Sequence, residues 1–301
     1  MFKHILVPLD GSTLAEAVLP VVRTLAIALR ARVTLLHIVE ADAPDTVHRE
    51  HHLSKPDEAA RYLEETARRC LSQALAVECH VHVVPSEDVT RSIVEHQAEL
   101  APDLIVMCAH GRSGYRRWRW GTIAQQVVAT GRVPVLLVRP GKGGTVGDFA
   151  CRRFLVPLDG SAEHEEGLRV AADLAEATGA MLCLVLIVPT PGTLAGAYAA
   201  VGRLMPHATR TVLDLAHRDG QEYLASIAAR LQTRGLKVEV ETVRGSVAAG
   251  VAAAARRTPP DMVIQATHGS AGTRAFWRGS LTPMLLARIP QPFLLVPVPP
   301  A

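Results

Sequence analysis

The sequence consists of two copies of one pattern, and this duplication constrains the fold more than any other feature. Residues 6–12, LVPLDGS, recur with the same seven letters as residues 155–161. Residues 108–122 contain His-Gly, nine further residues and Gly-Thr, and residues 266–280 repeat this spacing with Gly-Ser at the end. Because the repeated pieces keep their order along each half of the chain, they indicate that a whole domain has been duplicated.

Length and composition agree with two domains. The chain has 301 residues, of which 49% are hydrophobic, and this is enough for two cores of ordinary size. We expect one domain at residues 1–142 and a second at residues 151–301. The glycine-rich residues 141–147 between them have the composition of a flexible linker.

Charge and cysteine usage set the expected surroundings. A total of 32 Lys and Arg against 29 Asp and Glu gives a net charge of +3, which indicates neither a nucleic acid nor a membrane as partner. The five cysteines are scattered and form no CxxC pair, which favours free thiols in a reducing compartment. The apolar run at residues 5–9 is too short for a signal peptide or a membrane span. We therefore expect a cytoplasmic protein.

Strand and helix patterns alternate in both halves. In the first half, strands are expected at residues 5–9, 32–39, 77–84, 104–107 and 134–138, with helices at 13–29, 56–75, 86–100 and 122–130. In the second half, strands are expected at residues 153–158, 181–188, 237–243, 261–266 and 292–296. Pro20 predicts a kink or a late start in its helix, and residues 189–206 form an insertion, either a mobile loop or a short helical excursion. The alternation predicts an α/β fold, two tandem doubly wound five-stranded parallel-sheet domains.

Ligands of such sheets bind beyond the carboxyl ends of the strands, where the strand order reverses. Asp10, Gly11 and Ser12 follow the first strand, and the glycine-bearing residues 111–122 follow the fourth. Glycines allow close approach of backbone, and free amides at a helix N-terminus attract phosphate. Each segment alone also fits a plain turn and helix cap. If the first and fourth strands are neighbours, each copy has one crevice suited to a phosphate-bearing ligand.

The ordered combination of V-P-x-D-G-S, a later His-Gly with nine residues before Gly-Ser or Gly-Thr, and a P-V-L-L-V type last strand resembles the universal stress protein family in its tandem form. The resemblance implies the strand order 3-2-1-4-5, bound ATP or a related adenine nucleotide with or without Mg, and fifth strands that meet in an internal pseudo-dimer. A homodimer is also compatible with it. The implied nucleotide contacts are Pro8, Asp10, Gly11, Ser12, Val39, Met107, Cys108, Gly111, Arg112, Gly121 and Thr122 in the first copy and Pro157, Asp159, Gly160, Ser161, Val188, Gln265, Ala266, Gly269, Ser270, Gly279 and Ser280 in the second.

The chain departs from the family pattern at one position in each copy. The first glycine of the family's G-x-x-G is Cys108 in one copy and Ala266 in the other, so a side chain stands where bare backbone would approach the ligand. Alanine intrudes less than cysteine does. If the copies differ in affinity, we expect the second copy to be the better site.

Two other functions stay open. Cys108 and Ala266 also fit an interaction protein whose nucleotide sites have been lost. A slow ATPase is the other alternative, although the motifs contain no nucleophile and base pair and no catalytic residue is assigned. The arginines and aromatic residues at 112–120 read as a phosphate-proximal loop rather than a nucleic-acid surface, and His48, His51 and His52 as a solvated loop rather than a metal site.

Overall fold

The computed structural model describes residues 1–40, 46–47, 50–51, 53–71, 73–84, 89, 92–93, 99–109, 122–130, 132–141, 146–194, 196–267 and 281–298. The chain divides into two compact units. Unit 1 comprises Met1–Cys151 together with the C-terminal segment that begins at Gln291. Unit 2 comprises Arg152–Ala266 together with the segment that ends at Pro290. The domain limits expected from the sequence remain predictions.

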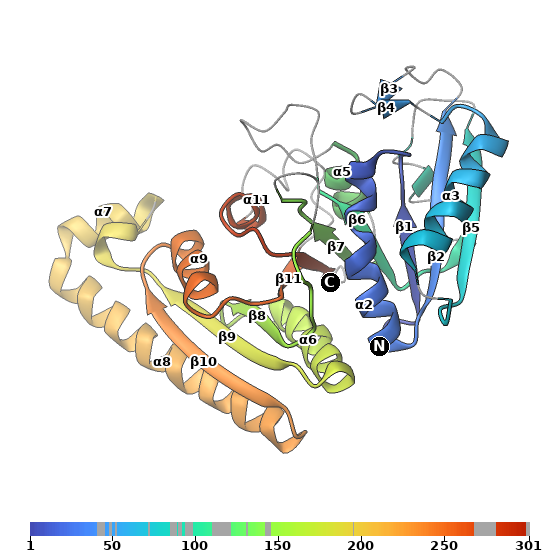
Figure 1. Ribbon diagram of the computed structural model, residues 1–301. Coiled ribbons are helices and arrows are strands. Elements are labelled where there is room, and N and C mark those ends of the chain that lie inside the picture. The colour runs from blue at the N-terminus through green and yellow to red at the C-terminus, as the bar shows by residue number, and fades with distance from the viewer. Residues whose placement is uncertain are drawn as a thin grey trace. The chain divides into compact units, whose positions relative to one another are not determined.

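The first half of the chain alternates strands and helices as expected (Figure 1). Its elements are β1 (His4–Pro8), α1 (Thr13–Glu16), α2 (Leu19–Leu29), β2 (Arg32–Glu40), β3 (Thr46–Val47), β4 (Glu50–His51), α3 (Pro56–Cys70), β5 (Val77–Val84), β6 (Leu104–Cys108), α5 (Thr122–Thr130) and β7 (Val135–Val138). The five main strands pair in parallel in the order β5-β2-β1-β6-β7. This is the predicted order 3-2-1-4-5.

The central strands β1 and β6 of unit 1 are buried because helices cover both faces of the sheet. All five residues of β6 are buried, as are the first four of β1. Helices α2 and α3 contact each other over one face, while α5 packs on β7 from the other. The doubly wound architecture of this unit is therefore as predicted.

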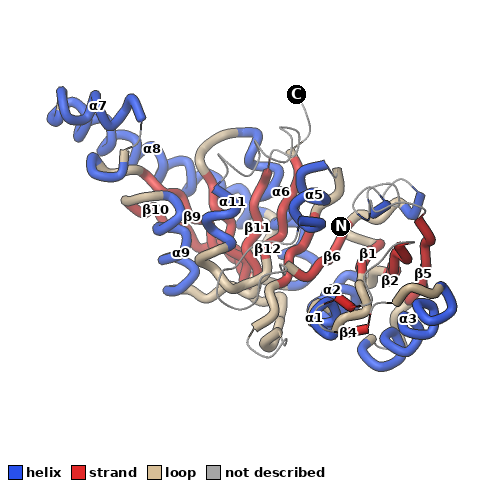
Figure 2. Tube along the Cα trace, turned by 90° about the horizontal axis from the view of Figure 1, so that it is seen from above, coloured by secondary structure: helices blue, strands red, loops and turns tan. Residues whose placement is uncertain are grey.

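The second half repeats the plan (Figure 1). Its elements are β8 (Arg153–Leu158), η1 (Ala162–His164), α6 (Glu165–Thr178), β9 (Met181–Val188), η2 (Pro191–Thr193), α7 (Gly196–Leu204), α8 (Pro206–Thr233), β10 (Lys237–Arg244), α9 (Val247–Arg257), β11 (Met262–Thr267), α11 (Leu281–Leu286) and β12 (Phe293–Pro297). Within unit 2 the order is β10-β9-β8-β11, with all pairs parallel. Figure 2 shows the strands of each unit lying side by side.

The last strand of the sequence belongs to unit 1. β12 pairs antiparallel with β7, with Phe293 opposite Leu137 and Leu295 opposite Val135. The second edge of β7 is therefore hydrogen-bonded, which removes an apolar edge that would otherwise be open to aggregation. The last strands of the two repeats are thus hydrogen-bonded to each other within this unit.

A repeated aspartate fixes the strand register at the amino end of each sheet. The carboxylate of Asp103 accepts hydrogen bonds from the backbone amides of Lys3 and His4, at 2.6 and 2.9 Å. The carboxylate of Asp261 accepts from the amides of Arg152 and Arg153, both at 2.9 Å. Each aspartate precedes the fourth strand of its copy, so it ties the first strand to the fourth and aligns their carboxyl ends.

Several local predictions need correction. The helix expected at residues 13–29 is two helices, α1 and α2, and Pro20 lies in the first turn of α2, where its missing amide is harmless. Helix α3 ends at Cys70 rather than residue 75. The loop before it contains the short pair β3 and β4. The insertion at residues 189–206 is helical and contains η2 and α7. Most of the helix expected at residues 86–100 lies outside the described residues.

No helix in the described ranges is both long and apolar enough to cross a bilayer.

Candidate functional site

The turn after β1 is held by its own side chains. The carboxylate Oδ1 of Asp10 accepts hydrogen bonds from the amide of Ser12 (3.0 Å) and from its hydroxyl (2.6 Å). The hydroxyl oxygen of Ser12 in turn accepts from the amide of Ala15 at 3.1 Å, so Ser12 is the N-cap of α1. Gly11 has φ of +87°, a conformation that favours glycine.

The turn after β8 has the same backbone and a different side-chain arrangement. The carboxylate Oδ1 of Asp159 accepts from the amide of Ser161 at 3.0 Å, and Gly160 has φ of +85°. Here, however, Oδ2 of Asp159 lies 2.6 Å from Nδ1 of His164, and the side chain of Ser161 makes no capping hydrogen bond. The Asp159 side chain is 54% exposed, so this carboxylate is open to solvent and to a ligand.

Strand register brings the turn and the end of the fourth strand to one edge in both copies. Ile5 pairs with Leu104, and the same offset places Asp10 level with Ala109, next to Cys108. Burial, and second to it the Asp10 carboxylate, raises the pKa of the Cys108 thiol, which is therefore neutral at physiological pH. The predicted crevice of the first copy thus has its Asp turn and its fourth-strand end at one place.

The second copy has the corresponding geometry. Phe154 pairs with Met262, and the same offset places Leu158 level with Ala266. Asp159 follows directly at this edge. Helix α6 approaches the same strand end very closely, because a Cβ atom at Gly167 would lie only 2.7 Å from the backbone nitrogen of Ala266. Gly167 therefore lets the helix that follows the Asp turn lie against the backbone of Ala266.

Gln265 joins the fourth strand of the second copy to the helix after it. Its side-chain amide donates to the hydroxyl of Thr282 on α11 at 3.3 Å, and Thr282 is almost fully buried. The side-chain oxygen of Gln265 is buried and accepts no hydrogen bond within the described part of the chain. A position that the resemblance assigns to nucleotide contact thus has a structural partner as well.

A leucine covers the Asp turn of the first copy. A Cβ atom at Gly11 would lie 3.0 Å from Cδ1 of Leu53, whereas a Cβ atom at Gly160 would meet no described residue within 4 Å. Leu53 forms a buried cluster with Val39 and Ala59, and Val39 is the position that the resemblance assigns to the adenine pocket. The space next to Val39 is therefore filled by the chain itself.

A buried histidine holds this leucine in place. Nδ1 of His37 donates to the carbonyl of Leu9 at 2.8 Å, and Nε2 lies 3.3 Å from the carbonyl of Leu53. His37 is 1% exposed, and its ring meets the ring of Tyr62 edge to face, with centroids 6.4 Å apart. The histidine on β2 thus connects the turn after β1 to the segment that precedes α3.

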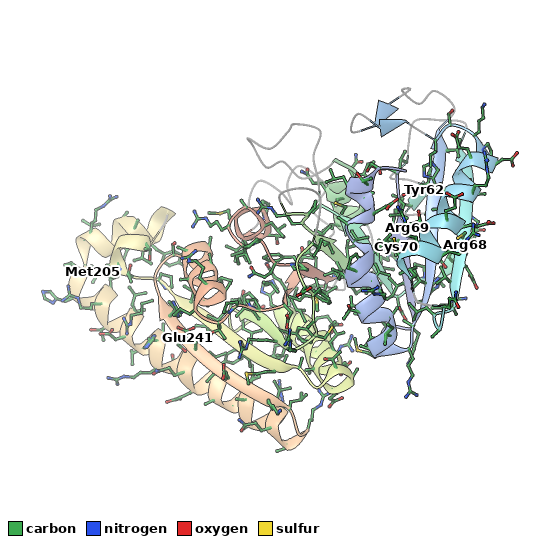
Figure 3. The ribbon with its side chains drawn as sticks, in the orientation of Figure 1. Tyr62, Arg68, Arg69, Cys70, Met205 and Glu241 are labelled. Atoms are coloured by element: carbon green, nitrogen blue, oxygen red, sulfur yellow. The ribbon has the colours of Figure 1, made fainter. Side chains whose placement is uncertain are left out.

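Helix α3 is also bound to the helix that follows Asp10. Arg69 on α3 donates to the carboxylate of Glu16 on α1 at 2.5 Å. Tyr62 on the same helix, labelled in Figure 3, has a buried hydroxyl with no hydrogen-bond partner in the described ranges. Burial, followed by the negative charge of Glu16, raises the pKa of Tyr62, so its phenol stays neutral. These contacts keep α3, and with it Leu53, against the first-copy turn.

The structure thus places part of the predicted site in each copy. Described at the carboxyl edges are Pro8, Asp10, Gly11, Ser12, Val39, Met107 and Cys108 in unit 1 and Pro157, Asp159, Gly160, Ser161, Val188, Gln265 and Ala266 in unit 2. Thr122 is the first residue of α5. Outside the described residues are Gly111, Arg112, Gly121, Gly269, Ser270, Gly279 and Ser280. Four further residues near these edges belong to no sequence motif and are recognisable only from their contacts: His37, Leu53, His164 and Gly167.

Doubly wound α/β units with an Asp-Gly-Ser turn at the switch between the first and fourth strands define a class of α/β proteins with a ligand site at the carboxyl edge. The model of the universal stress protein family matches residues 1–139 and again residues 150–297. The chain therefore belongs to the universal stress protein family, with one copy of the family domain in each half.

Relatives and solved structures agree with this assignment. A universal stress protein of Thermus aquaticus is 32% identical over 148 residues, which cover 46% of this chain and 100% of the relative. A universal stress protein of Synechocystis sp. is 28% identical over 139 residues, 46% of this chain and 86% of the relative. The crystal structure of a universal stress protein from Archaeoglobus fulgidus covers 98% of this chain and 96% of its own, with a TM-score of 0.64 and 15% identity. At that identity the likeness shows the fold.

Proposed function

We propose that this chain is a nucleotide-dependent regulatory module of the stress response that binds ATP or a related adenine nucleotide, and that it does so in its second copy. The observation that carries the proposal is the contrast between the two Asp turns. Among the described residues nothing covers Gly160, and Asp159 is exposed, whereas Gly11 lies under Leu53.

The described residues of the second copy suit the ribose side of a nucleotide. An exposed carboxylate such as that of Asp159 accepts hydrogen bonds from ribose hydroxyl groups. Gly160 adds no side chain, so a ligand can reach the turn backbone. His164, on the other oxygen of Asp159, fixes the orientation of the carboxylate. The phosphate-binding residues implied by the resemblance lie outside the described residues and are part of the proposal.

Magnesium fits this site only together with a nucleotide. Among the described residues, no group of three or more His, Cys, Asp or Glu side chains is arranged to hold a metal ion. Mg²⁺ typically binds through one or two carboxylates plus substrate phosphates. Asp159 would therefore be one ligand, directly or through water, of a cation that arrives with ATP.

The first copy fits the alternative of a degenerate site. Leu53 packs with Val39, where the resemblance puts the adenine, and a thiol stands at Cys108 in place of glycine. His37 on β2 contacts the carbonyl of Leu53, and Arg69 ties α3, which follows Leu53, to Glu16 of α1. The first copy then serves as a structural partner for the nucleotide-binding second copy.

Titration of the full-length chain with a fluorescent ATP analogue tests the proposal. Asp159→Ala is expected to weaken binding at least about tenfold, because a hydrogen bond to a charged group contributes about 1.5–3 kcal/mol. Asp10→Ala is the matched control, since it removes the same residue type from the same turn in the covered copy. It should change the dissociation constant by less than about twofold.

The opposite ranking of the two variants would assign the nucleotide to the first copy. Absence of binding by the unaltered chain, together with no nucleotide released from freshly purified and denatured protein, would favour an interaction protein with two lost sites. Leu53→Ala adds a further check, because it should create a second, weaker binding event only if the leucine is what closes the first copy.

We also propose a cytoplasmic location and an internal pseudo-dimer. None of the five cysteines, all of which lie among the described residues, forms a disulfide, which supports a reducing compartment. The pairing of β7 with β12 supports the pseudo-dimer, because it joins the fifth strands of both repeats. Amide hydrogen exchange of the full chain should show strong protection at Val135–Val138; fast exchange there would contradict the pseudo-dimer.

A further inference from the structure

Helix α7 exposes an apolar stripe that no described element covers. Tyr198 and Val201 lie three residues apart on one side of the helix, and Met205 follows directly after its last residue. Tyr198 is 75% exposed, Met205 58% and the adjacent Leu204 83%. Val212 and Leu215, on the first turns of α8, are also exposed. Large apolar side chains gathered in this way mark an interaction surface rather than ordinary scatter.

The stripe is one side of a helix whose other side is packed. Helix α7 contacts α8 and η2. A Cβ atom at Gly202 would lie 3.3 Å from Cδ1 of Leu194 and 3.6 Å from Cγ2 of Thr209, so this glycine lets α7 and α8 approach closely. Figure 3 labels Met205 where α7 meets α8, at the far end of unit 2 from α6. The helix is therefore anchored with its apolar side outward.

Basic residues prevail along the stripe. The sequence contains no Asp or Glu between Glu176 and Asp214, while Arg203 and Arg210 are exposed next to the stripe. Asp214, the first carboxylate reached along α8, is exposed and is paired with Arg244 at 2.9 Å. Up to residue 213, this part of the sequence therefore offers cations and apolar side chains without anions, and the first anion beyond it is neutralised by an arginine.

We propose that α7 and the first turns of α8 dock this protein on an anionic membrane surface. An interfacial helix places its apolar side chains at the boundary of headgroups and acyl chains, and flanking arginines bind anionic headgroups. A tyrosine at the rim suits the same boundary. The net charge of the chain indicates no membrane partner, because it does not show that these apolar side chains face solvent. The docking does not depend on nucleotide binding.

A second copy of this chain is a poorer occupant of the stripe. Two copies packed stripe against stripe would bring the arginines of one against the arginines of the other, with no carboxylate between residues 176 and 214 to offset them. An anionic bilayer satisfies both the charge and the apolar surface. Because two arginines and one short stripe are a small anchor, the binding should be reversible and weakened by salt.

Co-sedimentation of the full-length chain with vesicles tests the docking. The vesicles are pure phosphatidylcholine or phosphatidylcholine with about 30% phosphatidylglycerol, in low salt. We expect binding to the anionic vesicles that is at least about tenfold stronger than to the neutral ones. Leu204→Glu should abolish this binding, and Arg203→Glu with Arg210→Glu should lower it at least about tenfold. Both sites are exposed, so circular dichroism should report an unchanged fold.

Ile27→Glu is the matched control, because Ile27 is an exposed apolar residue on α2 of unit 1. It should keep the binding of the unaltered chain. No binding to anionic vesicles, equal binding to neutral ones, or equal loss in Leu204→Glu and Ile27→Glu would each overturn the proposal. Sedimentation equilibrium gives the remaining outcome: a dimer that Leu204→Glu dissociates would assign the stripe to a second copy and overturn membrane docking.

Discussion

Leu53 lies over Gly11, whereas no described residue lies over the equivalent Gly160. A Cβ atom at Gly11 would be 3.0 Å from Leu53 Cδ1 and 3.1 Å from Leu53 Cγ, while a Cβ atom at Gly160 would have no neighbour within 4 Å in the described part of the chain. The two glycines share their backbone conformation, with φ of +87° and +85°. One duplicated motif has therefore reached two different environments, and the difference comes from the segment before α3.

A pair of glycine substitutions measures this difference. Gly160→Ala should lower the free energy of unfolding by about 1–2 kcal/mol, the cost of a side chain in the left-handed region. Gly11→Ala should cost more, because the new methyl group must also displace Leu53. Urea denaturation of the full chain gives both values. Equal losses at the two positions would contradict a tight contact between Leu53 and Gly11.

The same contact predicts non-additive behaviour. Leu53→Ala should cost about 2–5 kcal/mol, since the side chain is buried. In the Leu53→Ala background, Gly11→Ala should lower the free energy of unfolding by about 0.5–3 kcal/mol less than it does in the unaltered chain, because the obstructing leucine is absent. The corresponding cycle of Leu53→Ala with Gly160→Ala should be additive. Coupling in that second cycle would mean that Leu53 acts through something other than its contact with Gly11.

His37 should be important for stability although it lies in no motif. His37→Phe keeps an aromatic ring but leaves the carbonyls of Leu9 and Leu53 without the ring nitrogens that face them. An unsatisfied buried polar group costs about 1–3 kcal/mol, and we expect a loss of this size on urea denaturation. His207→Phe, on the exposed start of α8, is the control and should change stability by less than about 0.5 kcal/mol. Similar small losses of stability at both positions would contradict the role of His37 in holding the first-copy turn against Leu53.

The fold was predictable because its signals are local and repeated. Apolar runs, the turn residues and the duplication give the strands, and β8 and β9 have the limits that the sequence predicts. Pro20 similarly predicts a break in the helical segment at residues 13–29, and α2 begins at Leu19. Alternation together with the family resemblance then gives the strand order of unit 1.

The contacts that distinguish the two copies were not predictable. Leu53 is a single leucine in a loop, and the sequence around it does not predict that its side chain packs on Gly11. Asp103 and Asp261 are repeated, but their hydrogen bonds to the start of the first strand in each copy span about a hundred residues of sequence. The alanine-rich α7 was open between loop and helix, because its apolar residues face solvent rather than a core. Each of these contacts and exposures depends on the tertiary structure, and the periodicity of apolar residues in the sequence does not predict it.

Gly167 should tolerate no side chain. A Cβ atom there would lie 2.7 Å from the backbone nitrogen of Ala266, and backbone cannot yield as a flexible side chain can. Gly167→Ala should therefore cost about 1–3 kcal/mol of stability, the usual price of overpacking. Gly192→Ala is the control, because a Cβ atom at Gly192 meets nothing within 4 Å. If the two variants are equally stable in urea, helix α6 does not approach the end of β11 as described.

Cys183 should make the stability of the chain fall at alkaline pH. Its thiol, on β9 opposite Glu239 of β10, donates to the Glu239 carboxylate at 3.8 Å. Burial first, and then the charge of Glu239, raises the pKa of Cys183 to about 11. The unfolded thiol has a pKa of about 8.5. Because the folded chain holds this proton more tightly, the contribution to stability is complete below about pH 8.5 and is lost as the pH rises through 11.

Cys183→Ala removes the titrating group and tests this sign. At about pH 7 the variant should be less stable than the unaltered chain, because it leaves a small cavity in β9. As the pH rises from about 8.5 to about 10.5, the gap should narrow, since only the unaltered chain loses the proton-linked contribution. Urea midpoints measured across this range give the gap directly. A gap that stays constant or widens would show that the Cys183 thiol titrates no higher in the folded chain than in the unfolded one.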